Sequence, residues 1–202
     1  MSWISWVALA GCGQAPPDVS VEEPVAQVQP ASIPAQDAPL QQLQLIAESS
    51  RIEWTASKVV GSQDGGFATF VATAQMRAGQ PVSVEAEIDL ASVFSEKEKL
   101  TTHLKSEDFF QVEKFTTARF RSDQFHVGGT GDATHTVTGT LDFHGVVQEI
   151  SFPMKLQVHE GGAKVQSEFG LDRQKWKISY PGKPDNLIQD EVVIRLDLAF
   201  AT

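Results

Sequence analysis

Apolar and polar side chains alternate along most of the chain that follows Arg51. Successive side chains of a strand point to opposite faces, so each alternating run predicts a strand with one buried and one solvated face. Further runs of this kind occupy residues 67–76, 118–125, 136–143, 150–158, 165–171 and 192–200. In the first of them the pattern places Phe67, Thr69, Val71 and Thr73 on one face and Ala68, Phe70, Ala72 and Met76 on the other. The clearest run covers residues 82–90, where five apolar side chains (Val82, Val84, Ala86, Ile88, Leu90) alternate with four polar ones (Ser83, Glu85, Glu87, Asp89).

The runs and the turns between them constrain the fold class. About eight of them are joined by short turns, without the regular strand–helix alternation of a parallel sheet. We therefore predict an all-β fold in which an eight-stranded antiparallel sheet closes on itself as a barrel. Such a barrel has room for its own side chains or for one small elongated ligand. A two-sheet sandwich fits the same pattern and stays open at this point.

One stretch, residues 95–115, departs from the strand pattern. Ser95 and Glu98 have the spacing of a capping box, and Leu100, His103 and Leu104 follow at helical spacing. Ser106 can cap a second short turn. The large apolar side chains that come next need a hydrophobic cavity to fill, and they are Phe109, Phe110, Val112 and Phe115. We therefore predict a short helical insert that acts as a lid or plug on the barrel.

Charge and cysteine content exclude several classes of protein. The chain has 26 acidic and 16 basic residues and a formal net charge of −10. That balance argues against nucleic-acid binding, which needs clustered Lys and Arg, and against electrostatic adsorption to an anionic membrane. Cys12 is the only cysteine, so an intrachain disulfide cannot form. No apolar run in the body of the chain is long enough to span a bilayer.

The N-terminal residues have the form of a bacterial lipoprotein signal. Residues 1–12 are largely apolar and end in Leu-Ala-Gly-Cys, the form of a lipobox whose Cys12 becomes lipidated. A positive n-region is missing, which an incorrectly assigned start codon would explain, and a chance cysteine is the alternative. Residues 13–46 are rich in Pro, Ala and Gln and predict a disordered tether before a barrel domain at 47–202. We expect a lipid-anchored protein of the bacterial cell envelope that faces the periplasm, with Gly13 favouring the outer membrane.

Large apolar residues at inward positions are the candidate ligand contacts. Many of them must serve simply as core, since every barrel needs apolar packing. The predicted ligand-binding residues are Trp54, Phe67, Phe70, Phe109, Phe110, Phe120, Leu141, Phe143, Phe152, Phe169 and Trp176.

Charged and titratable residues offer weaker candidates. Arg173, Lys175 and Lys177 alternate beside Trp176, which places three cations on one face of an expected edge strand. They can bind an anionic or quinone head group at the barrel mouth, or they can form a solvated edge that blocks aggregation. The five histidines are widely spaced, so we predict no metal site. Nucleophile-elbow and phosphate-loop motifs are absent, so we predict no enzymatic activity.

Four segments carry a resemblance to a known family. Residues 103–120 (HLKSEDFFQVEKFTTARF) closely resemble the signature of the YceI family. The resemblance recurs at 139–146 (GTLDFHGV), 169–173 (FGLDR) and 190–194 (DEVVI), and it covers roughly residues 51–200.

The resemblance implies a periplasmic or secreted lipocalin-like barrel that binds a polyisoprenoid lipid along its axis. The expected ligand is an isoprenoid quinone or a polyprenyl phosphate, with no other cofactor, and a homodimer is possible. Residues 95–115 become the candidate gate. The alternative is a stress-response or interaction protein whose barrel is filled by its own side chains. Residues 61–67 favour this alternative, because they lack the histidine that many relatives have there.

Overall fold

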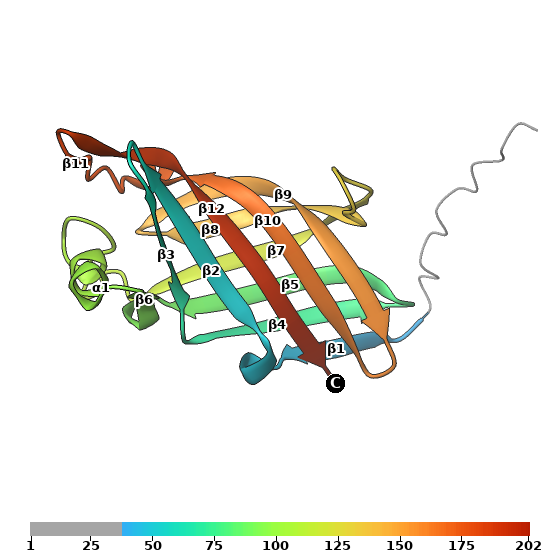
Figure 1. Ribbon diagram of the computed structural model, residues 1–202. Coiled ribbons are helices and arrows are strands. Elements are labelled where there is room, and N and C mark those ends of the chain that lie inside the picture. Colours follow the sequence, from blue (N-terminus) through green and yellow to red (C-terminus); the bar gives the residue numbers. More distant parts are fainter. Residues whose placement is uncertain (1–37) are drawn as a thin grey trace, which may run out of the picture. The chain divides into compact units, whose positions relative to one another are not determined.

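The computed structural model describes residues 38–202, and most of this part of the chain is strand (Figure 1). The one α-helix is α1 (Glu98–Lys105), and short 3₁₀ turns occur at η1 (Ala47–Ser49), η2 (Leu90–Ser92) and η3 (Arg173–Trp176). The strands are β1 (Leu40–Leu45), β2 (Arg51–Lys58), β3 (Ser62–Phe67), β4 (Phe70–Arg77), β5 (Gln80–Asp89), β6 (Val93–Ser95), β7 (Thr117–Val127), β8 (His135–Phe143), β9 (Val146–His159), β10 (Gly162–Asp172), β11 (Gly182–Lys183) and β12 (Asn186–Ala201).

The strands pair antiparallel in a ring that closes on itself. The order around the ring is β1, β4, β5, β7, β8, β9, β10 and β12, and β12 returns to β1 through the pairs Gln44↔Ala201 and Leu45↔Phe200. The predicted eight-stranded antiparallel barrel is therefore confirmed. The sandwich alternative is wrong, because the ring of strand pairings is continuous.

Three positions in the ring are each filled by two successive strands. β2 extends β1 along β12, β3 extends β4 beside β2, and β6 extends β5 beside β3. The break between β3 and β4 is held by the Thr69 backbone N–H, which donates to Ser92 Oγ (3.0 Å). This break shifts the alternation, so that Phe67 and Ala72 both face the interior. The sequence pattern, which treated residues 67–76 as one strand, placed them on opposite faces and was wrong.

The folded domain begins earlier than the sequence predicted. The expected tether of residues 13–46 overlaps β1, which pairs with both β4 and β12 and buries Leu43 to 2% exposure. β1 is short and rich in glutamine, so its alternation is weak in the sequence. The predicted signal peptide, Cys12 and the rest of the tether up to residue 37 lie outside the described residues.

The predicted helix forms, but the predicted capping box does not. The N-cap of α1 is Lys97, which makes no side-chain capping bond. Ser95 belongs to β6 instead, and its backbone N–H donates to Thr101 Oγ1 (2.9 Å), which fastens the helix to the barrel wall. Across residues 38–202 no helix has the length and apolarity that crossing a bilayer requires.

Candidate functional site

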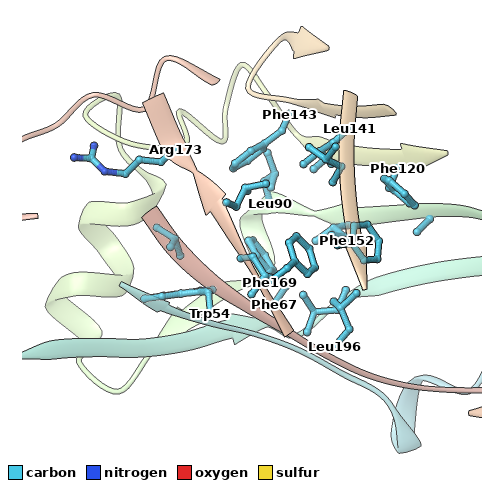
Figure 2. A pocket seen from close by; sticks show the side chains of 18 of the residues that line it. Trp54, Phe67, Leu90, Phe120, Leu141, Phe143, Phe152, Phe169, Arg173 and Leu196 are labelled. Atoms are coloured by element: carbon cyan, nitrogen blue, oxygen red, sulfur yellow. The ribbon is translucent and has the colours of Figure 1, made fainter. Parts of the chain in front are cut away.

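The barrel encloses a cavity of about 540 Å³ (Figure 2). This volume falls within the range of about 300–1,000 Å³ in which proteins hold small-molecule ligands. Its lining is drawn from the inward positions of the strands around the ring and from α1. The inward row of β12 shows how apolar this lining is, since the row consists of Val192, Ile194, Leu196, Leu198 and Phe200.

Most of the predicted ligand residues line this cavity. They come from different strands and from the insert, and they are Trp54, Phe67, Phe109, Phe110, Phe120, Leu141, Phe143, Phe152 and Phe169. Their contact with a ligand stays a prediction. Three of the rings form a contiguous group, with Phe152 stacked on Phe169 (centroids 4.4 Å apart) and Phe120 5.5 Å from Phe152. The same cavity is lined on one side of this group by Leu43 and on the other by His103, so the rings do not divide it.

Phe70 and Trp176 lie elsewhere than the sequence predicted. Phe70 is buried at the start of β4 but is absent from the cavity lining. Trp176 is fully buried (0% exposed) in η3, and its indole N–H donates to Leu141 O (3.3 Å). The carbonyl of Trp176 in turn accepts from His144 Nδ1 (2.9 Å). Trp176 therefore belongs to the wall that supports the cavity.

The turn that holds Trp176 has the geometry of a tight hairpin. His144 (φ 51°) and Gly145 (φ 72°) connect β8 to β9, and positive φ at both central residues is the mark of a type I′ turn. A Cβ at Gly145 would lie 2.6 Å from the Phe115 ring, so a glycine is required there for space as well. His144 therefore both forms this turn and, through Nδ1, fastens it to Trp176.

The insert packs over one end of the cavity. Leu100, His103 and Leu104 of α1 line it, together with Phe109 and Phe110 from the turn that follows. Figure 1 places α1 at the end of the barrel where β11 and the β2–β3 turn lie. The insert thus has the position of a lid, which we define as residues 98–115.

Aromatic contacts hold the lid in place. The His103 ring packs edge-on against Phe109 (5.0 Å) and against Tyr180 (4.9 Å), and Phe109 and Tyr180 lie 5.0 Å apart. His103 Nε2 donates to Asp108 Oδ2 (2.8 Å). Deeper in the barrel, Phe110 packs on Phe67 (6.1 Å) and on Phe143 (5.4 Å). Each contact of this kind contributes little free energy, so the lid is held in place by the sum of several weak contacts.

The opposite end of the cavity has no charged lining residue. Leu43, Ala72, Met76 and Phe200 pack together there. His135 is buried nearby, with Nε2 3.3 Å from Gln80 Oε1 and Nδ1 2.9 Å from Thr134 Oγ1. Burial lowers the pKa of His135 below its usual value, so the imidazole is neutral at pH 7. This end of the cavity is therefore uncharged. Ser83 lines the cavity there and Val82 does not, so the alternation predicted for these two residues is wrong, because the β4–β5 register shifts between Gln75 and Met76.

Arg173, Lys175 and Lys177 do not lie on an edge strand, and this interpretation is wrong. Asp172 accepts a hydrogen bond from the Gln174 backbone N–H (2.9 Å) and thereby caps the 3₁₀ turn η3. The strand alternation stops at that cap. Lys177 ends the turn with φ 61°, and both lysines are exposed and outside the cavity lining.

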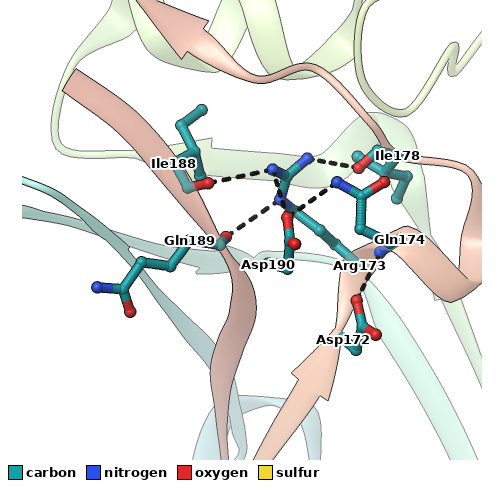
Figure 3. Close-up of polar contacts among 7 residues, drawn as sticks. All are labelled: Asp172, Arg173, Gln174, Ile178, Ile188, Gln189 and Asp190. Carbon is teal, nitrogen blue, oxygen red and sulfur yellow. Dashed lines mark hydrogen bonds and ion pairs between the residues drawn. The ribbon is translucent and has the colours of Figure 1, made fainter. Parts of the chain in front are cut away.

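Arg173 is buried, and four of its five N–H donors bind other groups of the protein (Figure 3). Its guanidinium donates to the carbonyls of Ile178 (2.6 Å), Gln189 (3.2 Å) and Ile188 (3.3 Å). It also pairs with Asp190 Oδ1 (3.1 Å), which accepts from Gln174 Nε2 as well. Arg173 therefore clamps η3 to the start of β12. In the sequence, the signal for this turn was Asp172, a residue type that caps turns, two positions before Gln174.

The described part of the chain offers no metal centre. Within residues 38–202 no group of three His, Cys, Asp or Glu side chains is arranged to hold a metal ion. His103, His135 and His144 make the separate contacts given above.

Comparisons with known proteins agree with this architecture. Residues 43–200 match the model of the YceI-like domain family. A UPF0312 protein of Pseudomonas fluorescens is 35% identical over 104 residues, which are 50% of this chain and 53% of the relative. A UPF0312 protein of Pseudomonas putida is 34% identical over 90 residues, 44% of this chain and 46% of the relative. The chain thus spans about half the length of the curated relatives it matches.

Solved structures share the fold at lower identity. BcnA of Burkholderia cenocepacia superposes with a TM-score of 0.66 at 19% identity, covering 78% of this chain and 99% of that protein. A polyisoprenoid binding domain from Saccharophagus degradans, implicated in plant cell wall breakdown, has a TM-score of 0.62 at 17% identity, covering 79% of this chain and 98% of that domain.

Because Arg173 clamps η3 to β12, its substitution should lower the stability of the protein much more than substitution of the neighbouring Lys175. We expect Arg173→Met to lower the free energy of unfolding by about 2–4 kcal/mol, because buried carbonyls lose their donors. Lys175→Met, two residues away and exposed, should change it by less than about 0.5 kcal/mol. Urea unfolding followed by tryptophan fluorescence measures both. Equal effects in the two variants would contradict the clamp.

Proposed function

Because the chain belongs to the YceI-like family, we propose that its barrel binds an isoprenoid lipid and carries or sequesters it without catalysis. The observation that supports this most directly is the 540 Å³ cavity with its apolar lining beneath a lid. The similarity in fold to a domain described as polyisoprenoid-binding points the same way. A barrel filled by its own side chains, the alternative function class, does not account for this cavity.

The lining can hold such a lipid by the hydrophobic effect alone. Burying each methylene contributes about 0.8 kcal/mol, so one five-carbon unit contributes roughly 4 kcal/mol before ordering costs. Several units would approach the practical limit of noncovalent affinity of about 20 kcal/mol, so those costs must offset much of the gain. The hydrophobic effect therefore suffices to bind the lipid, and release of the lipid is the step that needs a gating device. The lid is our candidate for that device.

We propose in addition that Cys12 carries the lipid anchor expected from the sequence. The Leu-Ala-Gly-Cys motif at residues 9–12 supports this, and so does the proline-rich composition of the residues that follow. An anchored carrier of the cell envelope, facing the periplasm and held at the outer membrane, would keep its barrel close to the lipids it binds. A homodimer is compatible with this arrangement.

Filling the cavity should abolish binding. Ala86 lines the cavity from β5, opposite Ala72 and Phe120 in neighbouring strands. We expect Ala86→Trp to weaken the affinity for a polyprenol at least tenfold, because the indole occupies the space of the hydrocarbon. Glu85→Trp adds the same ring to the outer face and should bind like the wild type. Tryptophan quenching and mass spectrometry of extracted lipid measure the effect, and unchanged affinity in the folded Ala86→Trp protein would overturn the proposal.

Loosening the lid should speed release. We expect Tyr180→Ala to raise the rate of polyprenol transfer to acceptor vesicles about tenfold, because it removes ring contacts to His103 and Phe109. Tyr180→Phe keeps the ring and serves as the matched control. A stopped-flow transfer assay follows the rate. If both variants release at the wild-type rate, residues 98–115 do not gate the cavity.

The anchor has a simple test in the native host. Cys12→Ser should move the protein from the membrane fraction to the soluble fraction, because the residue that accepts the lipid is gone. Gly13→Ser, beside it, should leave the protein in the membrane fraction. Fractionation with immunodetection reads the distribution. Retention of the Cys12→Ser protein in the membrane fraction would rule out this anchor.

A further inference from the structure

The charged residues of the cavity are all basic and all lie beneath the lid. The chain has 26 acidic residues, yet no Asp or Glu lines the cavity. Its charged lining residues are Lys58, Arg173 and Lys183. Arg173 directs four of its five N–H donors to Asp190 and three backbone carbonyls, and its charge is already paired with Asp190, so we leave it out of the ligand site. Lys58 and Lys183 form no ion pair with any carboxylate in residues 38–202.

These two lysines flank one short piece of β12. Lys58 is the last residue of β2 and pairs with Ile188, and Lys183 of β11 pairs with Asn186. The turn after Lys58 is tied to the same piece, since the Val59 N–H donates to Leu187 O (3.1 Å) and the Val60 N–H to Asn186 Oδ1 (3.0 Å). Lys58 and Lys183 therefore belong to one side of the cavity mouth.

The alternation of β2 directs Lys58 inward. Ile52, Trp54 and Ala56 line the cavity at every second position, and Lys58 continues the same row. The inward row of β2 therefore changes from apolar side chains to a cationic one at its last residue. A ligand that follows this row would have an apolar body and a polar end.

Neutral hydrogen-bonding groups complete the rim. Gln63 and Asn186 line the cavity beside the two lysines. Lys97, immediately before the lid, donates to Gln63 Oε1 (3.0 Å) and brings a third ammonium group to this rim. Two nearby carboxylates are engaged by other partners, since Asp64 accepts from Thr55 Oγ1 and Asp190 is held by Arg173. Asp185 lies in the turn between Lys183 and Asn186 and forms no ion pair within residues 38–202. We name Lys58, Gln63, Lys97, Lys183 and Asn186 the cationic rim.

We propose that the cationic rim binds the phosphate of an isoprenoid phosphate whose hydrocarbon fills the cavity. This inference rests on the proposed function and narrows its ligand to an anionic lipid. Ammonium groups that share a mouth repel each other, and an anion between them removes that repulsion. A phosphate offers several charged acceptor oxygens, and hydrogen bonds between charged groups are stronger than neutral ones. A quinone offers only neutral carbonyls and would leave the repulsion in place.

The test compares three lipids of equal chain length on the full chain: a polyprenyl phosphate, the polyprenol and an isoprenoid quinone. We expect the wild type to bind the phosphate at least tenfold more tightly than the polyprenol, with a preference that falls as salt rises. Lys58→Gln/Lys183→Gln should remove that preference and leave polyprenol affinity within about twofold of the wild type. Lys175→Gln/Lys177→Gln makes the same change in net charge outside the cavity and should retain the preference.

Each remaining outcome is decisive. Equal affinity of the wild type for the polyprenyl phosphate and the polyprenol would overturn the proposed role of the cationic rim but leave the proposed function intact. Equal losses of the phosphate preference in the two double variants would do the same. Failure of the folded protein to bind any of the three lipids would overturn the proposed function itself. Inorganic phosphate is then added as a competitor and should displace the polyprenyl phosphate only weakly. Competition as strong as that of the polyprenyl phosphate would show that the rim binds free phosphate, and the lipid assignment would then fail.

Discussion

The structure depends on the pairing of β12 along both of its edges. β12 pairs with β10 on one side and with β1 and β2 on the other, and these pairs close the ring. A closed ring has no free strand edge and fixes the distance between opposite walls. The inward side chains therefore cannot collapse onto one another as they do in a sandwich. The cavity is thus a consequence of hydrogen bonding in the wall, and its apolar character comes from the alternating sequence.

The fold could be predicted from the sequence because alternation in a strand depends only on neighbouring residues. The strand at residues 82–90 and the inward row at 192–200 were predicted from this pattern alone, and ring closure places both around one cavity. The predictions failed where the backbone leaves the strand. At residues 67–76 a break shifts the faces, and at Asp172 a cap converts the expected strand into a turn.

The site was only partly predictable for a related reason. Large apolar residues are conspicuous in a sequence, and most of those chosen do line the cavity. Trp176 was misplaced because a buried aromatic in the wall and one in the lining have the same signature. The cations were misjudged because their environment depends on distant segments: Arg173 meets residues 178–190 only after folding. Lys58 had a local signal, since it continues the inward row of Ile52, Trp54 and Ala56.

Tyr180 and Lys183 belong to one loop, only three residues apart in the sequence. Tyr180 packs on His103 and Phe109 of the lid, and Lys183 lies on the cationic rim. Only Pro181 and Gly182 separate the two residues, so a displacement of the backbone at one of them pulls on the other. Under the proposed function, movement of the lid away from Tyr180 would also displace Lys183, so release of the hydrocarbon and release of the polar end would be coupled. A molecule held at both points would leave this barrel in a single concerted movement.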